Sequence, residues 1–105
     1  MPEPITIKGI EKITEEEKSI INKLINSRFE KIQRQVKNET SIKVVVKTHE
    51  VESNRKKYGI EITAQIANNH FKSSESDWKL SEALNKALDK IQTEIEHKLH
   101  VSEQH

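Results

Sequence analysis

The chain has 105 residues, with 18 Lys and Arg against 17 Asp and Glu, and no cysteine. The length fits one domain, and a hydrophobic fraction of 32% allows only one thin core. The charges balance to +1 and the apolar residues are periodic, which argues against disorder. Without cysteine there is no disulfide framework, thiolate metal site or thiol nucleophile. With no membrane-length apolar run and no signal-peptide pattern at the N-terminus, we expect a cytoplasmic protein without membrane contact.

The first two predicted elements are a short strand and a long helix. Residues Ile5–Gly9 alternate apolar and polar side chains and close on a glycine, which is typical of a strand. Thr14-Glu15-Glu16-Glu17 has the spacing of a capping box, so a helix should start there and run from Glu15 to about Lys37. Its apolar face is built at spacings of three and four from Ile20, Ile21, Leu24, Ile25, Phe29, Ile32 and Val36.

Two further strands are predicted in the middle of the chain. Ile42–Lys47 is rich in β-branched residues and indicates a buried strand. The polar stretch 50–57, which ends in Arg55-Lys56-Lys57, is predicted to be a loop or hairpin tip. Tyr58–Ala67 then alternates cleanly, so it should be a strand with one buried and one wet face.

A hairpin and a second helix complete the predicted elements. Asn68-Asn69 suits a tight turn because Asn tolerates positive φ, and residues 70–75 would return as a strand with Phe71 pointing inward. Ser76 or Asp77 would cap the last helix. The apolar face of that helix is formed by Leu80, Ala83, Leu84, Ala87, Leu88, Ile91, Ile95 and Leu99.

The predicted fold class is α+β, with the order β-α-β-β-β-α in one domain over residues 1–105. Each helix has a single apolar stripe, so both should cover one face of a four-stranded sheet. The first crossover should be right-handed and its two strands parallel, followed by an antiparallel meander. The ordered part should span about 5–100, with 101–105 a flexible tail. The core residues expected to be buried together are Ile7, Leu24, Ile32, Val44, Ile62, Leu84, Leu88 and Ile91.

No arrangement of residues predicts catalysis. Glu94-x-x-His97 has the spacing of a carboxylate-bridged metal motif, but such sites need a second copy inside a helical bundle. An exposed helix end, where the dipole favours cations, explains these residues as well. Gly9 and Gly59 stand alone, which argues against a phosphate-binding loop. We therefore expect a non-enzyme that uses no cofactor, metal or small-molecule substrate.

Basic residues form three groups that could neutralise phosphates. On a helical wheel, Lys23, Lys31 and Arg34 lie along one edge of the first helix, and the last helix has a comparable edge next to an acidic strip. The alternative is an ordinary solvated edge paired with glutamates. Trp78 either anchors the start of the last helix or is an exposed contact for a base or a protein. The remaining basic candidates are Lys79, Lys86, Lys90 and His97 on the last helix, and Arg55, Lys56 and Lys57 at the predicted tip.

The strand Ile5–Gly9, the segment Phe29–Ile32, the strand Ile42–Lys47 and the segment Ser76–Ile91 resemble the ribosome hibernation promoting factor family, also called the ribosome-associated inhibitor or sigma-modulation family. The stretch from Ser76 to Lys98 looks most like archaeal members. The resemblance implies a fold similar to double-stranded-RNA-binding domains, and binding to rRNA in the decoding channel of the small ribosomal subunit.

Within that resemblance, Lys31, Lys86 and Lys90 match the rRNA-contacting positions on the two helices. Bacterial members continue the last helix with Lys and Arg, whereas this chain has Thr93-Glu94-Ile95-Glu96-His97-Lys98. The long forms carry a second domain that pairs ribosomes, so this chain should act as a short form. Its partner would be the small subunit, which it would block by occupancy, and it would be a monomer or weak homodimer. The alternative is a protein-interaction module that pairs through the open sheet face or an edge strand.

Overall fold

The predicted order of elements is confirmed. The computed structural model describes residues 4–51 and 55–99, and the expected tail 101–105 lies outside them. The elements are β1 (Ile5–Lys8), α1 (Glu15–Val36), β2 (Thr40–Val51), β3 (Arg55–Ile66), β4 (Asn69–Asp77) and α2 (Leu80–Leu99).

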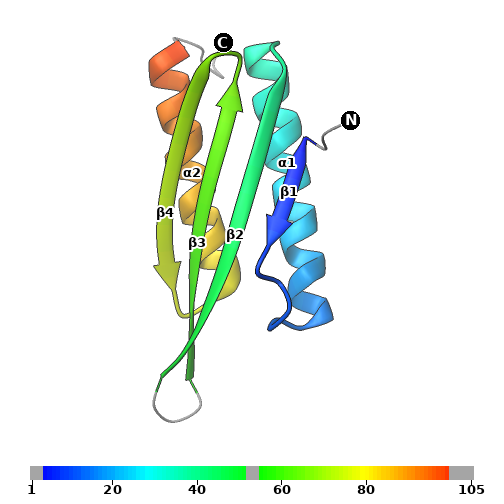
Figure 1. Cartoon of the computed structure of the whole chain (residues 1–105), viewed down its shortest axis with the longest axis vertical. Coiled ribbons are helices and arrows are strands. Elements are labelled where there is room, and N and C mark those ends of the chain that lie inside the picture. Colours follow the sequence, from blue (N-terminus) through cyan, green and yellow to red (C-terminus); the bar gives the residue numbers. More distant parts are fainter. Residues whose placement is uncertain (1–3, 52–54, 100–105) are drawn as a thin grey trace.

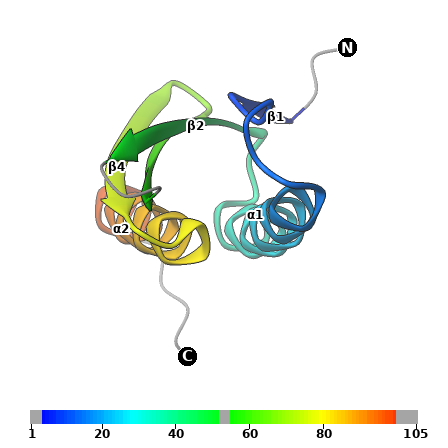
Figure 2. The ribbon, with the colours of Figure 1, turned by 90° about the horizontal axis from the view of Figure 1, so that it is seen from below.

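The four strands form one mixed sheet in the order β1-β2-β3-β4. β1 runs parallel to β2, with Ile5 opposite Ile42, and the other neighbours are antiparallel. Figure 1 looks onto the face of the sheet that carries no helix. Figure 2 shows both helices against the opposite, concave face. The predicted one-sided helix layer and the parallel first pair are therefore both confirmed.

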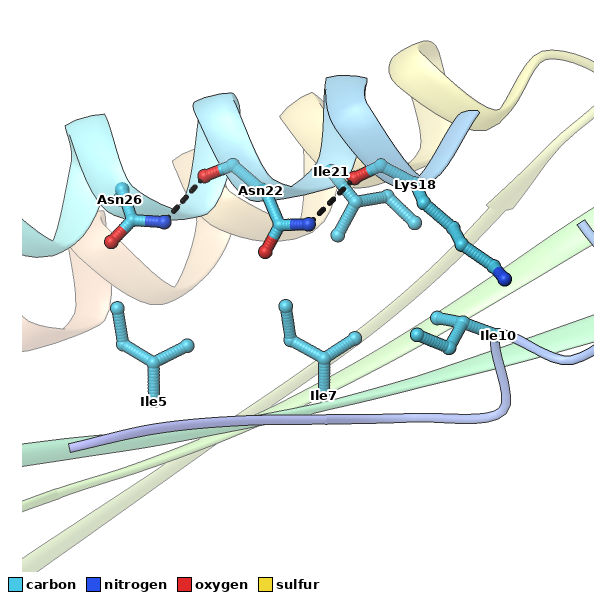
Figure 3. Close-up of a pocket in the computed structure, with 7 residues that line it drawn as sticks. All are labelled: Ile5, Ile7, Ile10, Lys18, Ile21, Asn22 and Asn26. Atoms are coloured by element: carbon cyan, nitrogen blue, oxygen red, sulfur yellow. Dashed lines mark hydrogen bonds between the residues drawn. The ribbon is translucent and has the colours of Figure 1, made fainter. Parts of the chain in front are cut away.

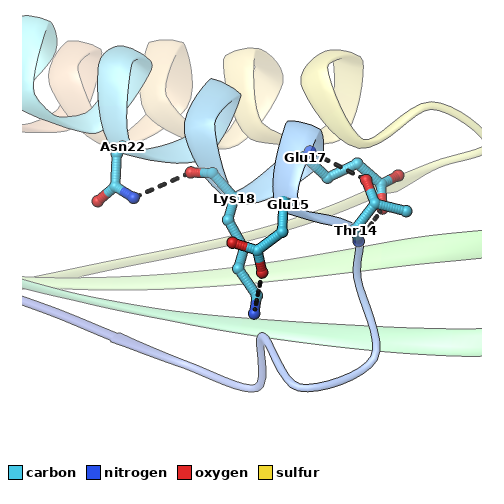
Figure 4. Close-up of polar contacts among 5 residues, drawn as sticks. All are labelled: Thr14, Glu15, Glu17, Lys18 and Asn22. Atoms are coloured by element: carbon cyan, nitrogen blue, oxygen red, sulfur yellow. Dashed lines mark hydrogen bonds and ion pairs between the residues drawn. The ribbon is translucent and has the colours of Figure 1, made fainter.

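Helix α1 begins where the capping box predicts. The Thr14 hydroxyl accepts a hydrogen bond from the Glu17 N–H at 3.1 Å, and the Glu17 carboxylate accepts one from the Thr14 N–H at 3.0 Å (Figure 4). An ion pair of 2.9 Å joins Lys18 to Glu15 in the same turn. At the other end, Lys37 adopts the left-handed conformation and its N–H bonds the Gln33 carbonyl, which closes the helix.

The core lies between the helices and the inner sheet face. Ile32, Val44, Ile62, Leu84, Leu88 and Ile91 are fully buried there, as predicted. Ser73 faces the same core, and its hydroxyl donates to the Ala87 carbonyl at 2.9 Å, so α2 lies close to β4. Figure 3 shows a gap between β1 and α1, bordered by Ile5, Ile7, Ile10 and Asn22 among others.

Some residues of the predicted core and of the predicted apolar helix faces are less buried than expected. Ile7 borders the gap between β1 and α1, which leaves it only partly buried. Leu24 is also partly buried, because it packs against the margin of the core cluster. Ile20 was assigned to the apolar face of α1, yet it is 41% exposed.

The hairpin between β2 and β3 is longer than the sequence predicts. Residues 50–57 were expected to be a loop, but Glu50 pairs with Lys56 and His49 pairs with Lys57. Both strands run on as a ladder of mostly polar residues to the lower end of the molecule in Figure 1. Such residues show no apolar alternation, so the sequence pattern could not reveal a strand. Arg55, Lys56 and Lys57 are therefore strand residues, while 52–54 lie outside the described part of the chain.

The predictions for the second turn and the second cap are wrong by one or a few residues. Ile66 pairs with Asn69, so the turn is Ala67–Asn68, and the residue with positive φ is Ala67. The Lys79 carbonyl accepts the first bond of α2, from the Ala83 N–H, which puts Lys79 at the capping position. Asp77 still helps from β4, because its carboxylate accepts the Lys79 N–H at 3.1 Å.

Candidate nucleic-acid interface

The predicted basic edge of α1 faces outward and toward α2. Lys23 and Arg34 are exposed, and Lys31 is half-buried beside a groove between the helices. Arg28, which the sequence analysis missed, bridges this groove. Its guanidinium donates to the Gln92 side chain at 3.1 Å and forms an ion pair with Asp89. The groove is lined by Arg28, Lys31, Asp89, Gln92, Thr93 and Glu96.

The predicted basic edge of α2 faces the other way, toward β4. The Lys86 ammonium lies 2.8 Å from the Asp77 carboxylate, and that of Lys90 lies 3.5 Å from Glu75. The hydrogen bond from Lys86 lowers the pKa of Asp77 below its ordinary value, and Asp77 in turn raises the pKa of Lys86.

The two basic edges therefore do not form one continuous surface. Asp89 and Glu96 of α2 point toward α1, where Asp89 meets Arg28 and Glu96 accepts a bond from Gln35 at 3.1 Å. An acidic strip thus separates the cations of α1 from those of α2. His97 is exposed in the last turn of α2, and Lys79 precedes the first.

The third predicted group meets Trp78 at one corner of the sheet. The Arg55 guanidinium lies 4.2 Å from the centre of the indole ring, and the Lys57 ammonium lies 5.5 Å from it. Both distances are within cation–π range. Because Trp78 is 42% exposed, it is a surface aromatic and not only an anchor for α2.

Lys56 lies on the opposite side of the strand, near the start of α1. There the Tyr58 hydroxyl donates to the Glu17 carboxylate at 2.8 Å. Burial alone would raise the pKa of Glu17, but hydrogen bonds from Thr14 and Tyr58 and the charge of Lys56 together lower it. Burial and the bond to Glu17 raise the pKa of Tyr58. This cluster joins the helix layer to the sheet.

Among the described residues, neither a metal centre nor a membrane-spanning helix is found. Glu94 and His97 are both exposed, and within 4–51 and 55–99 no three His, Asp or Glu side chains gather closely enough to hold a metal ion. In the same part of the chain, neither helix is long and apolar enough to cross a membrane.

Arg55 and Lys57 belong to a larger group of cations, whose other members, on β1, β2 and β4, were missed. The wet face of the Tyr58–Ala67 strand was predicted from its alternation, but the charges that the other strands add to the same face were not. The strand register places six basic side chains there, namely Lys8, Lys43, Lys47, Arg55, Lys57 and Lys72. Alternation along a strand can indicate which of its side chains share a face. The register between strands, which brings these cations onto one surface, cannot be read from the sequence.

Taken together, the fold and these surfaces define a small α+β domain with a helix-covered face, an open basic face and basic helix edges. Residues 5–100 match the family model described as sigma 54 modulation protein / S30EA ribosomal protein. The chain belongs to this family, which confirms the resemblance seen in the sequence. Among curated protein sequences, none is similar enough to this chain to count as a match.

Among the solved structures that share the fold are the following two. The N-terminal domain of Protein Y from Thermus thermophilus superposes with a TM-score of 0.68 at 20% identity, covering 93% of this chain and 99% of that one. A ribosomal subunit interface protein from Coxiella burnetii gives a TM-score of 0.62 at 12% identity, covering 91% and 97%. At these identities the similarity establishes a common architecture for the domain.

Proposed function

We propose that this protein binds rRNA of the small ribosomal subunit in the decoding channel, and blocks mRNA and tRNA by occupying their sites. The observation that carries the proposal is the family match, which spans residues 5–100. The likeness to a protein described as a ribosomal subunit interface protein supports it. Inhibition by occupancy needs no chemical step.

The helix cations would act by neutralising phosphates. Lys23 and Arg34 project into solvent and can reach a phosphate without rearrangement. Lys86 and Lys90 would first leave Asp77 and Glu75. Exposed ion pairs are weak, so this exchange is feasible, but it forfeits the contacts to Asp77 and Glu75. We therefore expect α1 to make the stronger contacts and α2 the weaker ones.

Co-sedimentation with small subunits at two salt concentrations tests the proposal. The wild type should pellet with subunits at low salt and be released as salt rises, because phosphate contacts release counterions. The variant K23E/R34E should lose association at both salts. The control K12E/K98E carries the same charge change at exposed sites outside the α1 edge and should still pellet. Equal loss in both variants, or no loss in either, would refute a role for the α1 edge.

Occupancy also predicts how translation is inhibited. Inhibition in a cell-free system should be stoichiometric with ribosomes and relieved by added mRNA and initiator tRNA, which compete for the same place. It should persist when EDTA is added at constant free Mg²⁺. Inhibition at protein concentrations far below that of ribosomes would indicate turnover and would contradict the proposal.

A further inference from the structure

The open face of the sheet forms a single surface, because residues opposite each other in neighbouring strands share a face. One row across the sheet runs Thr6, Lys43, Thr63 and Lys72, and the next runs Lys8, Val45, Glu61 and Ser74. Lys47 lies in a third row beside Gly59 and Ser76. No side chain in these rows is buried.

This open face carries a strong excess of positive charge. Its cations are the six basic residues Lys8, Lys43, Lys47, Arg55, Lys57 and Lys72, and among the described residues Glu61 is the one carboxylate on the same face. Glu61 is already paired, since its carboxylate lies 2.8 Å from the Lys47 ammonium. The acidic residues of β4, Glu75 and Asp77, point to the other side and meet α2. The excess positive charge is therefore not balanced within the face.

An aromatic ring stands at one end of this face. Trp78 follows β4 directly, and Arg55 and Lys57 on the outward side of β3 hold cations near its ring at 4.2 and 5.5 Å. Of the described large hydrophobic side chains, only Trp78 and Ile20 are exposed, and Ile20 lies on α1. The ring thus gives the basic face an apolar, stackable end.

We propose that the open sheet face is a second nucleic-acid-binding surface, distinct from the helix edges, which takes a single-stranded RNA segment. Its phosphates would lie over the row of Lys43 and Lys72, and a base would stack on Trp78. Hydroxyl side chains between the cations, such as Thr63 and Ser74, can bond phosphate or ribose oxygens. Lysine-lined surfaces with an exposed aromatic ring suit single strands, whose bases are free to stack.

A protein partner fits this face less well. Protein interfaces have an apolar centre, whereas the middle of this face offers only the half-buried Val45 among charged and hydroxyl side chains. A second copy of the chain would bring the same cations against each other. A single-stranded polyanion matches both the charge and the aromatic end.

Trp78 is the sole tryptophan of the chain, so its fluorescence reports on this surface. Titration with a short oligouridylate should quench it, and added salt should weaken binding. The variant K43E/K72E should weaken binding about tenfold or more, since it turns two phosphate contacts into repulsions. The control K12E/K98E carries the same charge change outside the face and should bind within about twofold of wild type. Both lysines of each pair are exposed, so thermal melting should show all the variants folded.

The outcomes separate this proposal from the ribosomal one, because the oligouridylate assay contains no ribosome. Quenching that is lost in K43E/K72E and kept in K12E/K98E supports the sheet face, whatever sedimentation with small subunits shows. Equal weakening in both variants would mean that affinity follows net charge, and would overturn the proposal. So would the absence of any fluorescence change with RNA, or a response only to an acidic peptide such as polyglutamate.

Discussion

The helix layer and the open sheet face differ in how their cations are paired with carboxylates. On the helix side, cations meet carboxylates: Lys86 lies beside Asp77, Lys90 beside Glu75, and Arg28 beside Asp89. On the open face, the cations of four strands share Glu61 as their one described carboxylate. A net charge of +1 therefore hides a strong local asymmetry. The kind of partner that a surface can bind therefore depends on where the charges lie and not on the net charge of the chain.

The largest expected loss of stability comes from substituting Gly9, which follows β1 and lies close against Val46 of β2. Its φ of +81° and the clash that an added Cβ would make with the Val46 carbonyl oxygen exclude any side chain. Gly9→Ala should lower the free energy of unfolding by about 3 kcal/mol or more and displace β1, which carries Lys8 on the open face. Urea denaturation measures the loss.

Gly59 is the matched control for Gly9, because it lies on the open face with room around it. An added Cβ there would meet Lys47 at an ordinary 3.7 Å. Gly59→Ala should leave stability unchanged or raise it by about 0.5 kcal/mol, since alanine reduces the freedom of the unfolded chain. Similar losses in both variants would contradict the close approach at Gly9.

A smaller effect is expected in the groove between the helices. Arg28→Met should lower the free energy of unfolding by about 1–2 kcal/mol, because it leaves the buried Gln92 without its donor while keeping the apolar stem. Lys23→Met, at an exposed site of the same helix, is the control and should change little. Equal urea midpoints for the two variants would show that the bridge does not stabilise the helix layer.

The contact that joins the two layers should show a pH signature. Tyr58→Phe removes the hydrogen bond to Glu17 and should cost about 1 kcal/mol near neutral pH. Because the folded state holds the pKa of Glu17 below its ordinary 4.5, its contribution is present above that value and is lost as pH falls through the lowered pKa. The difference from wild type should therefore shrink in acid. A difference that is constant from neutral to acidic pH would rule out this linkage.

The smallest effect is expected from the ion pairs along β4. Lys86→Gln removes the partner of Asp77, yet the melting temperature should stay within measurement error because the pair is solvated. Its binding to small subunits should weaken less than that of K23E/R34E. A large drop in melting temperature would instead show that α2 is held on the sheet by this pair.

Much of the fold was predictable because it depends on periodicity within single elements. The spacing of Ile21, Ile25 and Ile32 gave the buried stripe of α1, and the alternation from Tyr58 to Ile66 gave the central strand. The outer ends of β2 and β3 were not predictable, since residues such as Glu50 and Lys56 are solvated and show no apolar alternation. Ladder hydrogen bonds, which depend on backbone groups and not on residue type, extend them.

The candidate surfaces were harder to predict, because they depend on how elements face one another. A helical wheel orders Lys86 and Asp89 around α2 but cannot say that Asp89 faces α1 and Lys86 faces β4. Likewise, Lys43 and Lys72 are 29 positions apart and meet across Thr63 only through the register of three strands. Which helix cations contact rRNA stays a prediction.

The parallel pairing of β1 has a consequence for how the domain opens. Ile5 meets Ile42 only after the chain has passed through the whole of α1, whereas β2, β3 and β4 follow one another directly. Pairing β1 with β2 therefore closes a long loop, which costs entropy, and gains only the contacts of a four-residue strand. Local unfolding should detach this edge before the meander and α2 come apart, and amide hydrogens of β1 should exchange faster than those of β3. Lys8 would leave with that edge, so the extent of the basic face would fluctuate on the timescale of its opening.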